Sequence, residues 1–167
     1  FIEAIPKHIP IEDRNAIASF SNYSFDIFFL ESVLCLMLGV DVYLANKEQC
    51  LNPRRMKQLI LENGVDTLQI TPSRLMMLGV IDPDLSFLEK IKILMVGGEK
   101  FPLALLRELQ KHKNLRIYNM YGPTETTIWS CISELTKKNS VDIGKPIWGT
   151  RIHIFDENQD RFIHNVD

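Results

Sequence analysis

The stretch "KILMVGGEKFPLALLRELQKHKNLRIYNM", residues 92–120, contains the pattern that decides the fold. An apolar run at 92–96 predicts a strand, and a glycine pair follows it. The next segment, 102–112, predicts a helix, and 115–120 predicts a second strand. A strand, a helix and a strand in this order predict two parallel strands joined by a crossover helix.

The same alternation continues on both sides of this stretch. Further strands are predicted at 15–21, 40–45 and 66–71, and further helices at 26–38, at 52–64 and from Pro72 to about Leu78. Residues 127–135 look extended, and 150–157 alternate as a half-buried strand does. The sequence therefore predicts an α/β fold: a mainly parallel, doubly wound sheet with flanking helices.

The predicted helix over 26–38 is apolar on nearly all sides, which indicates a buried helix followed by a buried strand at 40–45. Ser24 or Asp26 is positioned to cap its start, and Gly39 to end it. The helix over 52–64 is amphipathic, with Asn52 as its cap and Gly64 at its end.

The segment 136–149 is the best candidate for a loop or a boundary between subdomains. We therefore expect residues 1–135 to form a core α/β subdomain, and 136–167 to form a linker and the start of a β-rich subdomain. The opening "FIEAIPKHIP" and the ending "RFIHNVD" suggest a piece of a longer protein.

Composition narrows the function classes. The 167 residues are 46% hydrophobic and 24% charged with a net charge of −2, and no basic stripe is present. This argues against nucleic acid or an anionic membrane as the main partner. No uncharged run reaches the length of a membrane span. Three scattered cysteines favour a reducing cytoplasm over a disulfide framework.

Three polar or glycine-rich segments follow predicted strands: 22–26, 97–100 and 121–127. In a doubly wound sheet, ligands bind beyond the carboxyl ends of the strands. We therefore expect all three segments to lie at one edge of the sheet.

The segment "YGPTETT" (121–127) carries the most specific chemistry. Tyr121 offers a ring for stacking on a base, and Gly122 with Pro123 fixes a turn. Thr124 offers a hydroxyl to a phosphate oxygen, and Glu125 offers the hard carboxylate that Mg²⁺ prefers. Such a cluster suits adenylyl or phosphoryl transfer. A threonine-rich turn would explain the hydroxyls alone, just as a tight turn would explain the glycine pair at 97–98.

Four motifs together resemble one family. "SNYSFDIFFLE" (21–31), "ILMVGGEKFP" (93–102), "NMYGPTETT" (119–127) and "DIGKPIWGTRIHIFDE" (142–157) resemble, in order and spacing, motifs of the adenylate-forming enzymes. The likeness is closest to the amino-acid-activating adenylation domains of nonribosomal peptide synthetases. It implies the large N-terminal portion of such an enzyme.

The resemblance implies a reaction and its partners. With ATP and Mg²⁺, the amino-acid carboxylate would be joined to AMP and pyrophosphate released. The aminoacyl group would then pass to a phosphopantetheine thiol on a peptidyl carrier domain, beside condensation domains of the same synthetase.

The resemblance also implies roles for individual residues. Tyr121 would stack on adenine, and the nucleotide site would be lined by Gly98, Glu99, Asn119 and Gly122. Thr124 would contact the α-phosphate, and Glu125 would bind Mg²⁺. Asp26 would pair with the substrate α-ammonium, although a plain helix cap would also explain it. The family's side-chain pocket maps to Asp26, Ile27, Leu30, Gln69, Met95, Gly97, Met120, Ile128 and Trp129.

Large side chains dominate this predicted pocket, with Trp129 at its end. A crowded pocket excludes large substrates sterically, so the sequence predicts glycine first and alanine second. The other interpretation is that these apolar residues are ordinary core.

The family's phosphate loop, ribose-binding Asp, hinge and catalytic Lys fall outside the 167 residues, so we expect the isolated chain to be inactive or nearly so. Two alternatives remain open. An acyl- or aryl-CoA synthetase shares the Tyr-Gly-x-Thr-Glu pattern but needs no ammonium partner, and Asp26 argues for an amino acid. A non-catalytic ATP-binding domain is the second alternative.

Overall fold

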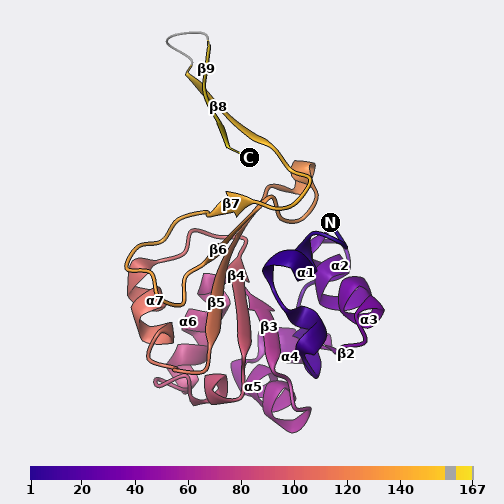
Figure 1. Ribbon diagram of the computed structural model, residues 1–167. Helices are drawn as coiled ribbons and strands as arrows, with labels where there is room; N and C mark the ends of the chain where they lie inside the picture. Colours follow the sequence, from indigo (N-terminus) through magenta and orange to yellow (C-terminus); the bar gives the residue numbers. More distant parts are fainter. Residues whose placement is uncertain (157–160, 167) are drawn as a thin grey trace.

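A computed structural model describes residues 1–156 and 161–166. Within them, one sheet has the strand order β2-β1-β3-β4-β5-β6-β7 (Figure 1). The strands are β1 (Ala16–Ser19), β2 (Asp41–Leu44), β3 (Thr67–Ile70), β4 (Ile93–Gly97), β5 (Arg116–Tyr121), β6 (Cys131–Glu134) and β7 (Lys145–Pro146). β1 to β5 are parallel, and β6 and β7 are antiparallel additions. The predicted α/β fold with a mainly parallel sheet is confirmed.

Helices cover both faces of this sheet (Figure 1). On one face lie α5 (Pro53–Glu62), α6 (Pro72–Ile81) and α7 (Leu103–Leu109). The other face is covered by α1 (Ile5–His8) and by a helix in three parts: α2 (Ile27–Phe29), a π-helical turn (Leu30–Leu34) and α3 (Cys35–Met37). Alternate strand residues supply the two apolar cores, since neighbouring side chains point to opposite faces.

Short elements absent from the sequence prediction complete the chain. They are α1, α4 (Lys47–Leu51), β7, β9 (Arg161–Val166), and 3₁₀ turns at Ile11–Asp13, Ser86–Glu89 and Thr124–Thr126. β9 pairs with β8 (Ile152–Asp156) in a hairpin that extends away from the main sheet (Figure 1). Residue 157 of the predicted strand 150–157 lies outside the described residues. The division at residue 136 stays a prediction.

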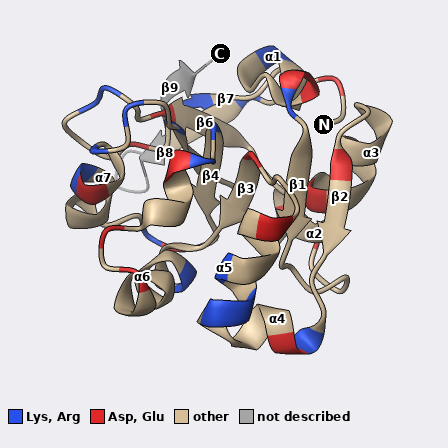
Figure 2. Cartoon of the chain, turned by 90° about the horizontal axis from the view of Figure 1, so that it is seen from below, with Lys and Arg blue, Asp and Glu red and all other residues tan. Residues whose placement is uncertain are grey.

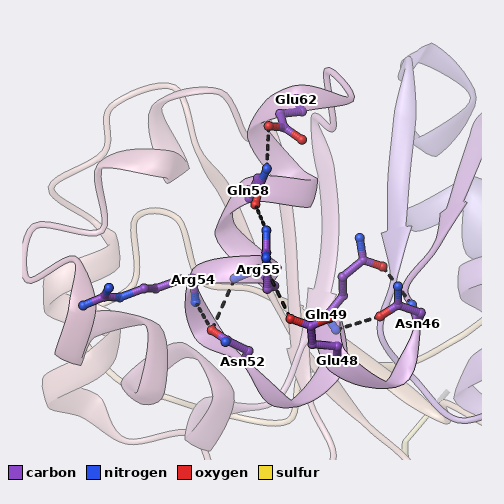
Figure 3. Close-up of polar contacts among 8 residues, drawn as sticks. All are labelled: Asn46, Glu48, Gln49, Asn52, Arg54, Arg55, Gln58 and Glu62. Carbon is purple, nitrogen blue, oxygen red and sulfur yellow. Dashed lines mark hydrogen bonds and ion pairs between the residues drawn. The ribbon is translucent and has the colours of Figure 1, made fainter.

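The starts of α4 and α5 follow local capping rules. Asn52 accepts hydrogen bonds from the backbone N–H groups of Arg54 and Arg55 at the start of α5, and Asn46 forms a capping box with Gln49 on α4 (Figure 3). Gly39 ends α3 with a φ of +77°, a conformation that glycine adopts without strain. α4, α5 and α7 each carry both basic and acidic residues (Figure 2).

Three predictions of buried or extended segments were wrong. The helix over 26–38 is not buried all round, because Val33, Leu36 and Met37 are exposed. β2 is not a buried strand: it lies at the edge of the sheet, and Asp41 and Leu44 are exposed. Periodicity cannot distinguish an edge strand from a central one, because neighbours distant in sequence decide it.

The third error concerns the predicted extended run over 127–135. Only Cys131–Glu134 form a strand, while Thr127 and Ile128 have left-handed backbone conformations with φ of 68° and 65°. These β-branched residues favour strands locally, so the left-handed turn must be held by contacts elsewhere.

Candidate adenylation site

Two of the predicted segments meet where β4 and β5 end. A cavity of about 570 Å³ opens there, which we call the β4–β5 cavity. Its lining includes Gly98, Glu99, Asn119, Tyr121 and Gly122, together with Lys100, Phe101, Met120, Pro123, Trp129, Val141, Asp142 and Ile143. The parallel strands carry both segments to one edge of the sheet, as predicted.

The backbone at this edge requires glycine. Gly98 has a φ of +81°, in the left-handed region. A Cβ atom at Gly122 would lie 2.6 Å from the carbonyl oxygen of Ile128, so only glycine lets the two chain segments pass so closely. The glycines at 98 and 122 therefore shape the cavity whatever occupies it.

Polar groups of Asn119 and Glu99 are already engaged. The buried Asn119 donates from Nδ2 to the carbonyl oxygen of Asp142 at 2.7 Å. The Glu99 carboxylate accepts from the backbone N–H of Ser73, at 3.1 Å, and from its hydroxyl. Glu99 thus caps the first turn of α6, where a negative charge is favourable.

Thr124 and Glu125 form an exposed 3₁₀ turn beside the cavity, and the ring of Tyr121 is about half exposed at the cavity rim. Over residues 1–156 and 161–166, no group of three or more His, Cys, Asp or Glu side chains could hold a metal ion. Magnesium needs no such group when phosphate oxygens supply most of its ligands, so a single carboxylate at Glu125 is compatible with it.

Asp26 does not cap the helix that follows it, contrary to one prediction. Its Oδ2 atom instead accepts a hydrogen bond from the backbone N–H of Ile128 at 3.1 Å. Ser24 does not cap that helix either; its N–H and hydroxyl bond to Asn22. The bond from Asp26 joins the segment after β1 to the segment after β5, so the third predicted segment also lies at this edge.

The predicted side-chain pocket is a packed cluster on the α1–α3 side of the sheet. Trp129 is 1% exposed, and its indole Nε1 donates to Oε1 of the buried Gln69 at 3.2 Å. A Cβ atom at Gly97 would lie 2.6 Å from the Trp129 ring. The same apolar cluster contains the other apolar pocket residues: Ile27, Leu30, Met95, Met120 and Ile128.

A buried acid without a role assigned from the sequence lies against the end of β1. Glu31 is 1% exposed and accepts hydrogen bonds from the Ser19 hydroxyl, the Ser21 hydroxyl and the Ser21 N–H, at 2.8, 2.8 and 3.0 Å. Burial raises the pKa of the Glu31 carboxyl, although these bonds and the charge of Arg74 act against the rise. A charged residue inside an apolar run was the available signal.

The wall formed by residues 141–143 was also missed, because it lies in the segment assigned as a loop.

No helix in the described part of the chain combines the length and the apolarity that a membrane span requires.

Comparison with known proteins defines the class. Residues 2–166 match the AMP-binding enzyme family, so the chain belongs to that family. Its sequence is that of part of an adenylation domain related to those of nonribosomal peptide synthetases.

Relatives support this assignment. The chain is 34% identical over 158 residues to the dimodular nonribosomal peptide synthase of Bacillus subtilis, covering 93% of this chain and 6% of the relative. It resembles PA1221, a synthetase protein containing adenylation and PCP domains, with a TM-score of 0.75 and 29% identity over 90% of this chain and 26% of that one. The synthetase FmoA3, in its AMPPNP-bound form, shares the fold with a TM-score of 0.81, at 21% identity, over 94% of this chain and 18% of that one. This chain therefore spans a small part of the proteins it matches.

Proposed function

We propose that this chain forms the amino-acid side and the adenine side of an active site that converts an amino acid and ATP to an aminoacyl-AMP and pyrophosphate. The observation that carries the proposal is the β4–β5 cavity, lined by Gly98, Asn119 and Tyr121 in a member of the AMP-binding family. In this proposal a flat base lies between the backbone at Gly98 and the ring of Tyr121, which both line the cavity.

The exposed turn beside the cavity has two roles in this proposal. The Thr124 hydroxyl donates to an α-phosphate oxygen, and Glu125 binds Mg²⁺ through its carboxylate. The substrate carboxylate attacks the α-phosphorus, a new P–O bond forms, and pyrophosphate leaves. Mg²⁺ offsets the negative charge that collects on the phosphate oxygens.

Asp26 recognises the substrate α-ammonium in this proposal. One carboxylate oxygen accepts a bond from Ile128, and the other has no hydrogen-bond partner among the described residues. A carboxylate can accept several hydrogen bonds at once, so both interactions can coexist. An acid without an amino group would gain nothing from Asp26, which favours an amino-acid substrate over the acyl substrate of a CoA synthetase.

The packed cluster around Trp129 supports glycine as the substrate, with alanine second. Trp129, Met95 and Met120 are buried, and the ring of Trp129 occupies the space beside Gly97. Little room is left beside Gly97 for a substrate side chain, while a separate apolar cavity of about 600 Å³ is lined by Asp26 and Ile128. The aminoacyl group then passes to the phosphopantetheine thiol of a peptidyl carrier domain, with condensation domains as further partners.

The test is ATP–pyrophosphate exchange by a complete adenylation domain containing this chain, measured with every proteinogenic amino acid and with acetate. Glycine-dependent exchange that acetate cannot replace is the expected result. Exchange with phenylalanine or leucine would refute the glycine assignment alone. Exchange with acetate in place of any amino acid would favour the CoA-synthetase alternative, and no exchange by a folded domain would favour a non-catalytic ATP-binding domain.

A further inference from the structure

One wall of the β4–β5 cavity is held by a group of polar side chains to which the family resemblance assigns no role. Ser133 on β6 lies directly opposite Asn119 on β5, so both side chains point to the same face of the sheet. The chain at 141–143 folds back over this face and lines the cavity. Ser133, Lys138 and Asp142, which we call the Asp142 cluster, connect these parts.

Three short contacts close the Asp142 cluster. The Ser133 hydroxyl donates to Oδ1 of Asp142 at 2.6 Å, and Lys138 Nζ donates to Oδ2 of Asp142 at 2.8 Å. Lys138 Nζ also donates to the Ser133 hydroxyl at 2.9 Å. Hydrogen bonds from Lys138 and Ser133 hold the pKa of the Asp142 carboxyl below its usual range, so the carboxylate is charged at neutral pH.

The backbone of Asp142 orients Asn119. Its carbonyl oxygen accepts a bond from the side-chain amide of Asn119 at 2.7 Å. A carbonyl oxygen only accepts, so the NH₂ group of Asn119 must face Asp142, and the Oδ1 atom remains as an acceptor for other groups. The position of residue 142 therefore decides which end of the Asn119 amide is available in the cavity.

Gly144, the residue that follows the 141–143 wall, shows how closely this part of the chain packs against β6. Gly144 has a φ of +78°, and a Cβ atom there would overlap the carbonyl oxygen of Ile132 on β6. The chain can approach β6 so closely only with glycine at this position. The wall is thus placed by backbone packing at 144 and by side-chain bonds at 142.

We propose that Ser133, Lys138 and Asp142 are positioning residues for nucleotide binding, because they hold the 141–143 wall and orient the Asn119 amide. This inference rests on the proposed function. None of the three has to touch the nucleotide; they act through Asn119 and the wall. Their loss should weaken ATP binding selectively and leave the amino-acid pocket, on the opposite face of the sheet, unchanged.

The test compares Lys138→Met with Lys137→Met in the complete adenylation domain, measuring kcat and the KM values for ATP and for glycine. Lys137 is exposed and adjacent, so its substitution makes the same charge change without touching the Asp142 cluster. We expect Lys138→Met to raise the KM for ATP roughly three- to tenfold, the effect of losing a charged hydrogen bond. The KM for glycine and kcat should stay within about twofold, and Lys137→Met should match wild type.

Two further variants keep the test decisive. Lys138→Arg should restore the KM for ATP, and Asp142→Asn, which retains the backbone carbonyl, should weaken ATP binding as Lys138→Met does. A lower kcat with an unchanged KM for ATP would mean a purely structural role and would overturn the inference. An unchanged KM in both Lys138→Met and Asp142→Asn would overturn it too, while failure of the wild-type domain to use ATP would overturn the proposed function as well.

Discussion

Asp26 and Ile128 are 102 positions apart in the chain, and Oδ2 of Asp26 accepts a hydrogen bond from the N–H of Ile128 at 3.1 Å. Ile128 and Thr127 both have left-handed backbone conformations, which cost β-branched residues about 1–2 kcal/mol each. The bond gives the Ile128 N–H an acceptor in a turn that cannot form a regular strand ladder. This turn also directs the Trp129 side chain toward Gly97 and Gln69.

Substitution of Asp26 should separate its contribution to folding from its proposed role with the substrate. Asp26→Ala removes the acceptor and should lower the free energy of unfolding by about 1–2 kcal/mol. Asp26→Asn keeps an acceptor oxygen for Ile128, so its free energy of unfolding should fall by less than about 1 kcal/mol. Urea denaturation of the chain gives both values, and equal losses in the two variants would show that this bond contributes nothing.

The KM for glycine tests the proposed role of Asp26 with the substrate. If Asp26 pairs with the α-ammonium, Asp26→Asn should raise the KM for glycine at least about tenfold in the complete domain, because the charge is gone. A variant that folds as well as wild type and keeps its KM for glycine would rule out the ammonium role.

Gly97 should tolerate no side chain. A Cβ atom there would lie 2.6 Å from both the Trp129 ring and the Met120 carbonyl oxygen, so Gly97→Ala should destabilise the chain by about 1–3 kcal/mol. Gly79→Ala is the matched control, since the nearest atom to a Cβ in that helix is 3.8 Å away. It should stabilise α6 by up to about 1 kcal/mol. Thermal unfolding would contradict the packing argument if both variants shifted Tm in the same direction.

Much of the fold could be predicted from local pattern. The strand–helix–strand unit over 92–120 has periodicity, a glycine pair and a proline that all agree, and the structure forms β4, α7 and β5 there. The proximity of segments 97–100 and 121–127 could also be predicted, because ligands bind where parallel strands end. This rule depends on topology alone, so it needed no side-chain detail.

Contacts between distant residues could not be predicted. The cap assigned to Asp26 was a reasonable local interpretation, but the partner it has in the structure lies on another strand connection. Glu31 and Asp142 likewise have partners whose proximity only the folded sheet creates. The exposure of Leu36 and Met37 shows the same limit, because an apolar helix does not reveal which of its sides is covered.

Trp129 should control the size of substrate that is accepted, if the packed cluster is the substrate pocket. Trp129→Ala removes the ring beside Gly97 and should raise the kcat/KM of leucine relative to that of glycine at least about tenfold. The ratio is the useful measure, because truncating a buried Trp also costs about 3–5 kcal/mol of stability and lowers the active fraction.

Phe87→Ala is the control for this change. Phe87 is a fully buried aromatic in the apolar cluster on the opposite face of the sheet, so its removal should leave the ratio unchanged. A ratio that moves equally in both variants would place the specificity outside the pocket assigned here.

Glu31 should make folding stability depend on pH in a direction opposite to most carboxylates. Burial raises the pKa of the Glu31 carboxyl in the folded chain above the unfolded value, so the folded state binds more protons between these two pKa values. The contribution of Glu31 to the free energy of unfolding is therefore fully present below the unfolded pKa and is lost as pH rises through the folded pKa. Each unit of pKa difference corresponds to about 1.4 kcal/mol.

Glu31→Gln removes this titration. The variant should therefore gain stability relative to wild type as pH rises from 4 toward neutrality, in a series of urea denaturations spaced by about half a pH unit. Asp142 and Glu134, whose pKa values are lowered chiefly by hydrogen bonds from Lys138 and Arg116 respectively, titrate in both proteins and cancel in the difference. If the difference in free energy of unfolding between wild type and Glu31→Gln stays constant with pH, Glu31 has the same pKa in the folded and unfolded states. If wild type becomes more stable than the variant as pH rises, the bonds from Ser19 and Ser21 outweigh the burial of the charge.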